Sequence, residues 1–188
     1  MKSRYLGLLL YVFLLPVQAT EIAGQQFDDE ITLTDNQKSL QLNGVGVRYK
    51  FFFKIYIAAL YLEEKSEDIK QIIESSQAKR VVMHFLYDKV EKEKLVSAWM
   101  EGFEDNLSTE EFKALAPRIK LFNALFETLE SGDVIYLDFI PGKGTRVISK
   151  GRQKGIIEGD DFYAALLKIW LGDEPVDEDL KAALVGAD

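Results

Sequence analysis

The chain has 188 residues and a formal net charge of −8, with 31 acidic against 23 basic side chains. This length is typical of one domain, and a hydrophobic share of 47% excludes a wholly disordered chain. An acidic surface repels phosphate backbones, which argues against a general nucleic-acid binder. Because the sequence has no cysteine and one histidine, it excludes disulfides, zinc–thiolate sites and multi-histidine metal sites.

The N-terminal segment 1–19 has the layout of a secretory signal peptide. Lys2 and Arg4 form a basic head, residues 6–15 form an apolar run, and small side chains lead to Ala19. The run is shorter than the roughly 20 residues that a transmembrane helix needs. We therefore expect cleavage after Ala19, a mature domain over 20–188 without a stable membrane span, and export, with a bacterial periplasm as the predicted compartment. The alternative is a buried N-terminal strand or helix.

The first part of the mature chain reads as strands. Short strands are expected at 31–33 and 39–42, ahead of a turn signal at Asn43-Gly44. Residues 45–62 are aromatic and β-branched almost throughout. They predict one long strand, or two strands joined by a bulge, at the centre of a sheet.

Helices are expected next, before a second group of strands. Leu95, Trp99 and Phe103 are spaced four apart, and Ser108 with Glu111 matches a capping box. Pro117 is expected to kink or split the helix that follows this box. Grouped strands and grouped helices predict an α+β fold, an antiparallel sheet with helices on one face. The other expected elements are strands at 80–87, 134–140, 146–149 and 155–158, and helices at 66–75, 90–107, 162–171 and 177–184.

A few side chains in these elements are candidates for chemistry. Arg48 stands beside a Gly-Val-Gly stretch, and a buried guanidinium there needs a carboxylate, either the protein's own or a ligand's. Tyr56, Tyr61 and Tyr87 lie among apolar neighbours, where phenol rings either line a cavity or pack as core residues. His84 alternates with apolar residues and is more typical of packing, although one histidine suffices for axial haem ligation.

Four segments together resemble the chalcone isomerase family. The first is LNGVGVRYKFFFKIYIAALYL, with a Gly-x-Gly-x-Arg motif and a lysine-containing strand that ends in Tyr-Leu. The others are YDKVEKEKLVSAW, GDVIYLDFIPGKGTRVISKG and IIEGDDFYAALLKIWLGDEPVDEDLKAALVG, in the same order along the chain. The leader and the tail are similar to the bacterial, exported, non-catalytic branch of the family. The resemblance implies an open-faced β-sandwich, in which a large antiparallel sheet is covered by a helical layer, with a ligand cleft between them.

The resemblance also indicates which isomerase positions this chain keeps. In true isomerases an arginine activates the substrate, a threonine and a tyrosine act on the enolate through water, and an asparagine and a Ser/Thr hold the far end. Arg48 matches the arginine and Tyr87 the tyrosine, whereas Tyr56 replaces the threonine, Lys94 the asparagine and Ile169 the Ser/Thr. Because this reaction depends on exact polar placement, the replacements argue against chalcone cyclisation and against an enzyme in general.

Other members of the family bind fatty acids without catalysis, through the arginine and a tyrosine. We therefore expect an exported carrier or sensor of a small amphipathic acid, with the carboxylate at Arg48 and no cofactor or metal. The alternatives are haem binding, with Arg48 at a propionate and His84 at the iron, a degenerate intramolecular lyase, or an interaction protein with a filled cleft. The sequence leaves the oligomeric state open. The expected ligand-binding residues are Arg48, Tyr56, Tyr87, Lys94 and Ile169.

Overall fold

The computed structural model describes residues 19–33 and 37–186. The predicted signal peptide therefore lies outside the described residues except for Ala19, its last residue. Ala19 begins β1 (Ala19–Ile22), which pairs antiparallel with β2 (Gln25–Asp28). Across the described ranges, no helix is both long enough and apolar enough to span a membrane.

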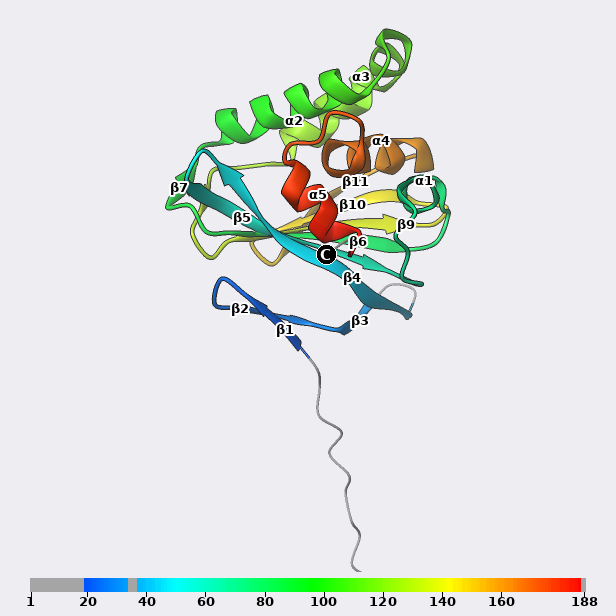
Figure 1. Ribbon diagram of the computed structural model, residues 1–188. Helices are drawn as coiled ribbons and strands as arrows, with labels where there is room; N and C mark the ends of the chain where they lie inside the picture. The colour runs from blue at the N-terminus through cyan, green and yellow to red at the C-terminus, as the bar shows by residue number, and fades with distance from the viewer. Residues whose placement is uncertain (1–18, 34–36, 187–188) are drawn as a thin grey trace, which may run out of the picture.

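A seven-stranded antiparallel sheet forms the centre of the molecule (Figure 1). Its strand order is β11-β10-β9-β6-β5-β4-β3, so neighbours in the sheet are neighbours in sequence except where β6 pairs with β9. Two-residue strands β7 (Lys89–Val90) and β8 (Leu129–Glu130) pair outside this sheet. The strands of the large sheet are β3 (Glu30–Leu33), β4 (Lys38–Lys50), β5 (Phe53–Leu62), β6 (Lys79–Phe85), β9 (Val134–Ile140), β10 (Gly144–Ser149) and β11 (Arg152–Ile157).

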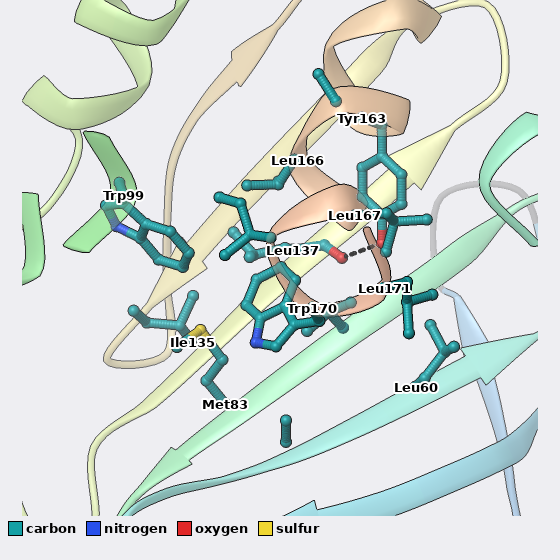
Figure 2. Close-up of a cluster of buried hydrophobic side chains, with 14 of the residues drawn as sticks. Leu60, Met83, Trp99, Ile135, Leu137, Tyr163, Leu166, Leu167, Trp170 and Leu171 are labelled. Atoms are coloured by element: carbon teal, nitrogen blue, oxygen red, sulfur yellow. Dashed lines mark hydrogen bonds between the residues drawn. The ribbon is translucent and has the colours of Figure 1, made fainter. Parts of the chain in front are cut away.

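The helices cover one face of this sheet (Figure 1). Helices α2 and α3 lie in the connection from β6 to β9, and α4 packs between α2 and the sheet through Trp170 and Leu166 (Figure 2). The expected open-faced sandwich is thus confirmed. The helices are α1 (Ile69–Glu74), α2 (Lys92–Asn106), α3 (Thr109–Ala124), α4 (Asp160–Leu171) and α5 (Glu178–Leu184).

The two faces of the sheet carry separate cores, because side chains alternate along each strand. On β5, Ala58 and Leu60 belong to the large core under the helices. Ile57 and Ala59 belong to a smaller core that includes Phe27 of β2. The hairpin β1–β2 therefore lies against part of the face that the helices leave open (Figure 1).

The capping box before α3 is confirmed. The Ser108 hydroxyl accepts a hydrogen bond from the backbone N–H of Glu111, and the Glu111 carboxylate accepts one from the backbone N–H of Ser108. Pro117 does not split the helix, which continues to Ala124. Burial of Ile119 and Phe122 after the proline holds the second half of α3 against the core and offsets the missing backbone hydrogen bond.

The prediction for residues 45–62 is wrong in its connectivity. The segment is not a continuous or bulged strand, because the chain reverses at Phe51-Phe52 and Lys50 pairs with Phe53. The turn contains no glycine, asparagine or proline, so the usual turn signals are missing from the sequence. The long apolar run is instead the two sides of a hairpin.

The turn predicted at Asn43-Gly44 is also wrong. Both residues lie inside β4, where the pairing with β5 shifts between Leu42 and Gly44. The Asn43 amide donates hydrogen bonds to the carbonyls of Ser66 and Leu184 and accepts one from the backbone N–H of Ser66. Asn43 therefore joins a strand to two distant segments, a role that local sequence does not reveal.

Candidate functional site

A cleft of about 380 Å³ opens where β5, β6 and β7 meet the first turns of α2. Its size falls in the range of small-molecule sites, roughly 300–1,000 Å³. The cleft lies on the helix-covered side of the sheet, as the resemblance implied. Its apolar wall consists of Ile55, Tyr56, Phe85, Val90, Leu95 and Ala98.

Lysine side chains surround this apolar wall. Lys50 of β4, Lys89 of β7 and Lys94 of α2 all line the cleft, against a single acidic residue, Glu91, among the described lining residues. Lys89 Nζ lies 3.4 Å from Glu91 Oε1, and both side chains are more than half exposed. Within the described chain, Lys50 and Lys94 form no ion pair. The cleft therefore has an excess of positive charge in a protein whose net charge is −8.

Tyr56 forms the floor of the cleft. Its hydroxyl oxygen accepts a hydrogen bond of 3.0 Å from the indole Nε1–H of Trp170, which reaches from α4 towards the sheet (Figure 2). Burial raises the pKa of Tyr56 to about 12, so the phenol stays neutral at any physiological pH. Its ring lies 5.6 Å from that of Phe85, measured between centroids. Tyr56 thus lines the cleft, and its hydroxyl oxygen is held by the Trp170 indole, whereas no hydrogen bond donated by the Tyr56 O–H is found among the described residues.

Arg48 stands opposite Tyr56 in the pairing of β4 with β5 and lies on the same face of the sheet. It does not line the cleft. Its Nη1 lies 3.2 Å from Asp177 Oδ2 and also donates to the carbonyl of Tyr49. Asp177 is the N-cap of α5, and its Oδ1 accepts from the backbone N–H of Leu180 at 3.1 Å. The partner of Arg48 in this structure is therefore the protein's own carboxylate, and the pair fastens α5 to β4.

The two glycines before Arg48 serve the same contact. A Cβ at Gly44 would overlap the carbonyl oxygen of Ala183, and a Cβ at Gly46 would lie 2.7 Å from the Ala183 side chain. Only glycine lets the backbone of α5 approach β4 this closely. The Gly-x-Gly-x-Arg motif is therefore the surface on which α5 docks.

The other expected site residues divide between the cleft and the core. Tyr87 and Lys94 line the cleft, and Tyr87 is 38% exposed. Ile169 does not line it, because its side chain is 1% exposed and fills the contact between α4 and α2. A Cβ at Gly102 of α2 would lie only 2.8 Å from Ile169 Cγ2. The structure thus brings together Tyr56, Tyr87 and Lys94 and leaves Arg48 and Ile169 outside the cleft.

His84 and Tyr61 lie on the other face of the sheet. His84 pairs with Ile57, whose side chain belongs to the smaller core, and burial lowers the pKa of His84. The Tyr61 hydroxyl donates to the carbonyl of Asp28 at 3.0 Å. His84 and Arg48 are therefore separated by the sheet, and the structure does not bring them to one haem. Among the described residues, no three metal-ligating side chains cluster together.

Sequence reasoning missed Lys50, Lys89 and Trp170 at this site. Lys50 follows Arg48 by two positions in β4, and side chains two residues apart on a strand point to the same face of the sheet. A prediction that ended the strand at Lys50 could therefore have included this lysine. Trp170 adjoins Ile169, which the resemblance selected instead. A helix position shifted by one residue points about 100° away, so an ungapped match in α4 is sensitive to a single-residue error.

These features define an α+β protein of the open-faced-sandwich type, with a lysine-rimmed apolar cleft between sheet and helices. The chain belongs to the chalcone isomerase-like family, whose model matches residues 19–186. Among solved structures it is similar to a fatty-acid binding protein of Arabidopsis thaliana, with a TM-score of 0.68 and 14% identity over 89% of this chain and 96% of that one. At this identity the likeness shows the fold alone. No curated protein sequence matches the chain.

Proposed function

We propose that the protein binds a small amphipathic carboxylic acid, such as a fatty acid, in this cleft and does not transform it. The observation that carries the proposal is an apolar wall surrounded by three lysines in an otherwise acidic protein. An alkyl chain packs on the wall, and the carboxylate meets ammonium groups that shield its charge. The similar Arabidopsis structure is that of a fatty-acid binding protein, which supports the same ligand class.

Lys50 and Lys94 are the proposed partners of the carboxylate, in place of Arg48. Both line the cleft and neither is ion-paired within the described residues. Arg48 is already paired with Asp177, and a ligand that recruited it would weaken the attachment of α5. In this proposal Arg48 positions α5, and the lysines bind the ligand.

The polar replacements support binding rather than isomerisation. The Tyr56 hydroxyl is hydrogen-bonded to Trp170, and Ile169 is buried in the contact between helices. Ile169 has no group to offer an enolate, and enolate stabilisation needs donors aimed at the developing charge.

Export to a bacterial periplasm is a further part of the proposal, supported by the signal-peptide pattern of residues 1–19. Intact-mass measurement of the protein recovered from its native compartment tests it. The expected result is the mass of a chain that begins at Thr20, and an uncleaved chain recovered from the cytoplasm would contradict the proposal.

Ligand binding is tested by displacement of a fluorescent fatty-acid analogue with palmitate and with methyl palmitate. We expect K50Q/K94Q to weaken palmitate by about tenfold or more, as the loss of charge-assisted contacts implies, and to change the ester little. The matched control is K113Q/K120Q, which removes two exposed lysines from α3. R48Q tests the original expectation for the arginine.

The outcomes separate the two assignments. If R48Q selectively weakens the acid and K50Q/K94Q does not, Arg48 is the carboxylate partner and the lysine assignment is wrong. If neither palmitate nor its ester displaces the probe, and native mass spectrometry finds no bound acid, the proposed function itself is wrong.

A further inference from the structure

The β4–β5 turn carries the most exposed aromatic side chains of the described residues. Phe51 and Phe52 are 88% and 80% exposed. The Phe52 and Phe53 rings lie 4.3 Å apart between centroids, and the Phe53 ring lies 5.6 Å from that of Tyr87 in an edge contact. The side chains of Phe51, Phe52 and Phe53 at this turn are here called the aromatic tip.

The backbone at the tip is unfavourable for the residues it carries. Phe51 has a φ of 57°, in the left-handed region, and is the first residue of a two-residue hairpin turn. Turns with a positive φ at this position favour glycine, which has no Cβ to clash. The chain instead places a phenyl ring there and leaves it in water. Neither the strain nor the exposure helps the fold, and such a combination marks a surface that binds a partner.

The charged side chains of the turn segment itself are basic, and the nearby Asp177, which accepts from the backbone N–H of Tyr49, is paired with Arg48. Lys50 and Lys54 flank the turn, and the sequence contains no acidic residue from 37 to 62. Lys89 and Lys94 lie on the neighbouring side of the cleft. Aromatic rings with adjacent lysines match the boundary between lipid headgroups and acyl chains, where rings insert and ammonium groups contact phosphates. A protein partner is less favoured, because a two-residue turn offers far less area than the roughly 800 Å² per partner of a stable interface.

The aromatic tip adjoins the opening of the cleft. Lys50 and Tyr87 line the cleft, and Tyr87 also contacts Phe53 of the tip. Figure 1 places the β4–β5 turn at the end of the sheet near β7, which contributes Lys89 and Val90 to the cleft. A surface that held the tip would therefore lie close to the cleft opening.

We propose that the aromatic tip inserts into the headgroup region of an anionic lipid bilayer, with Lys54 at the lipid phosphates. Docked in this way, the cleft exchanges its acid directly with the membrane. The exchange rests on the proposed function, whereas the docking does not, so docking and acid binding are measured separately.

Docking is tested by flotation of the purified protein with vesicles of phosphatidylglycerol and phosphatidylcholine in equal parts, and with phosphatidylcholine alone. We expect the protein to float with the anionic vesicles, and F51S/F52S to weaken this binding by about tenfold or more, since two interfacial rings are lost. K54E should weaken it as well, and added salt should weaken it further. The control is L121S, which removes a 61% exposed leucine from α3 and should change nothing. Every variant carries the same N-terminal segment, so differences between variants report the tip.

Insertion is measured with Phe52→Trp and vesicles of the same composition that contain brominated lipid. The native Trp99 and Trp170 are 3% and 1% exposed, so quenching reports the introduced indole. Binding without quenching would overturn insertion.

The absence of binding to anionic vesicles, or a self-association that F51S/F52S abolishes, would overturn the docking proposal. F51S/F52S should bind the fluorescent fatty acid in solution as the unmodified protein does, because neither phenylalanine lines the cleft. Vesicle binding without fatty-acid binding would refute the proposed function alone.

Discussion

The hydrogen bond between Tyr56 and Trp170 joins the floor of the cleft to α4, and its removal by Tyr56→Phe should destabilise the fold. The substitution leaves the Trp170 indole N–H, in a side chain that is 1% exposed, without its acceptor at 3.0 Å. A buried donor left unpaired costs about 1–3 kcal/mol. The hydroxyl that is lost was itself buried, which offsets part of this, so we expect a loss of about 1–2 kcal/mol. For a domain of this size, each kcal/mol lowers Tm by roughly 2–4 °C.

The assay is urea unfolding followed by circular dichroism and tryptophan fluorescence, with an unchanged m-value as the sign that only stability has changed. Tyr87→Phe is the matched control, because its hydroxyl forms no hydrogen bond with the described residues. It should change the free energy of unfolding by less than about 0.5 kcal/mol. A Tyr56→Phe variant as stable as this control would refute the reasoning, since water in the cleft would then satisfy the indole N–H.

Three further substitutions test packing and buried charges elsewhere in the fold by urea unfolding. Gly44→Ala should displace α5 and cost about 2 kcal/mol or more, because the new Cβ overlaps the carbonyl of Ala183; an unchanged midpoint would contradict the docking surface. Burial lowers the pKa of Lys79 from 10.5 to about 8, so between these pH values the unfolded chain binds more protons than the folded one. The free energy of unfolding of the wild type, compared with that of Lys79→Met, should therefore rise with pH across this window. Parallel pH profiles of the two proteins would contradict this. Asp138→Asn should cost about 3–5 kcal/mol, because the fully buried carboxylate accepts hydrogen bonds from two guanidinium groups; a loss below about 1 kcal/mol would show that the guanidiniums find other partners.

Much of the secondary structure follows from local pattern. The capping box at Ser108 depends on residues close in sequence, as does the helix predicted from the four-residue spacing of Leu95, Trp99 and Phe103. Both lie where expected. The strand expected at 134–140 matches β9. Such signals are reliable because the interactions behind them are made within one helical turn or one strand.

The hairpin at Phe51-Phe52 shows the opposite case. Its turn residues have no local preference for reversal, and Phe51 adopts a positive φ. The reversal is imposed by the nine residue pairs between β4 and β5 and by burial of both strands in the sheet. The pairing and burial energy of the whole hairpin outweighs the unfavourable turn, and it cannot be predicted from the few residues of the turn alone.

For the candidate site, the sequence with its family resemblance determined the fold, the layer in which a cleft lies, and Tyr56, Tyr87 and Lys94 as part of its lining. Only the tertiary structure decided the chemistry around that cleft. It paired Arg48 with Asp177, 129 residues away, buried Ile169 against α2, and placed His84 beyond the sheet. The physical reason is that a charged or polar group takes its role from the partner within hydrogen-bond reach. That partner is set by how strands and helices pack, not by spacing along the chain.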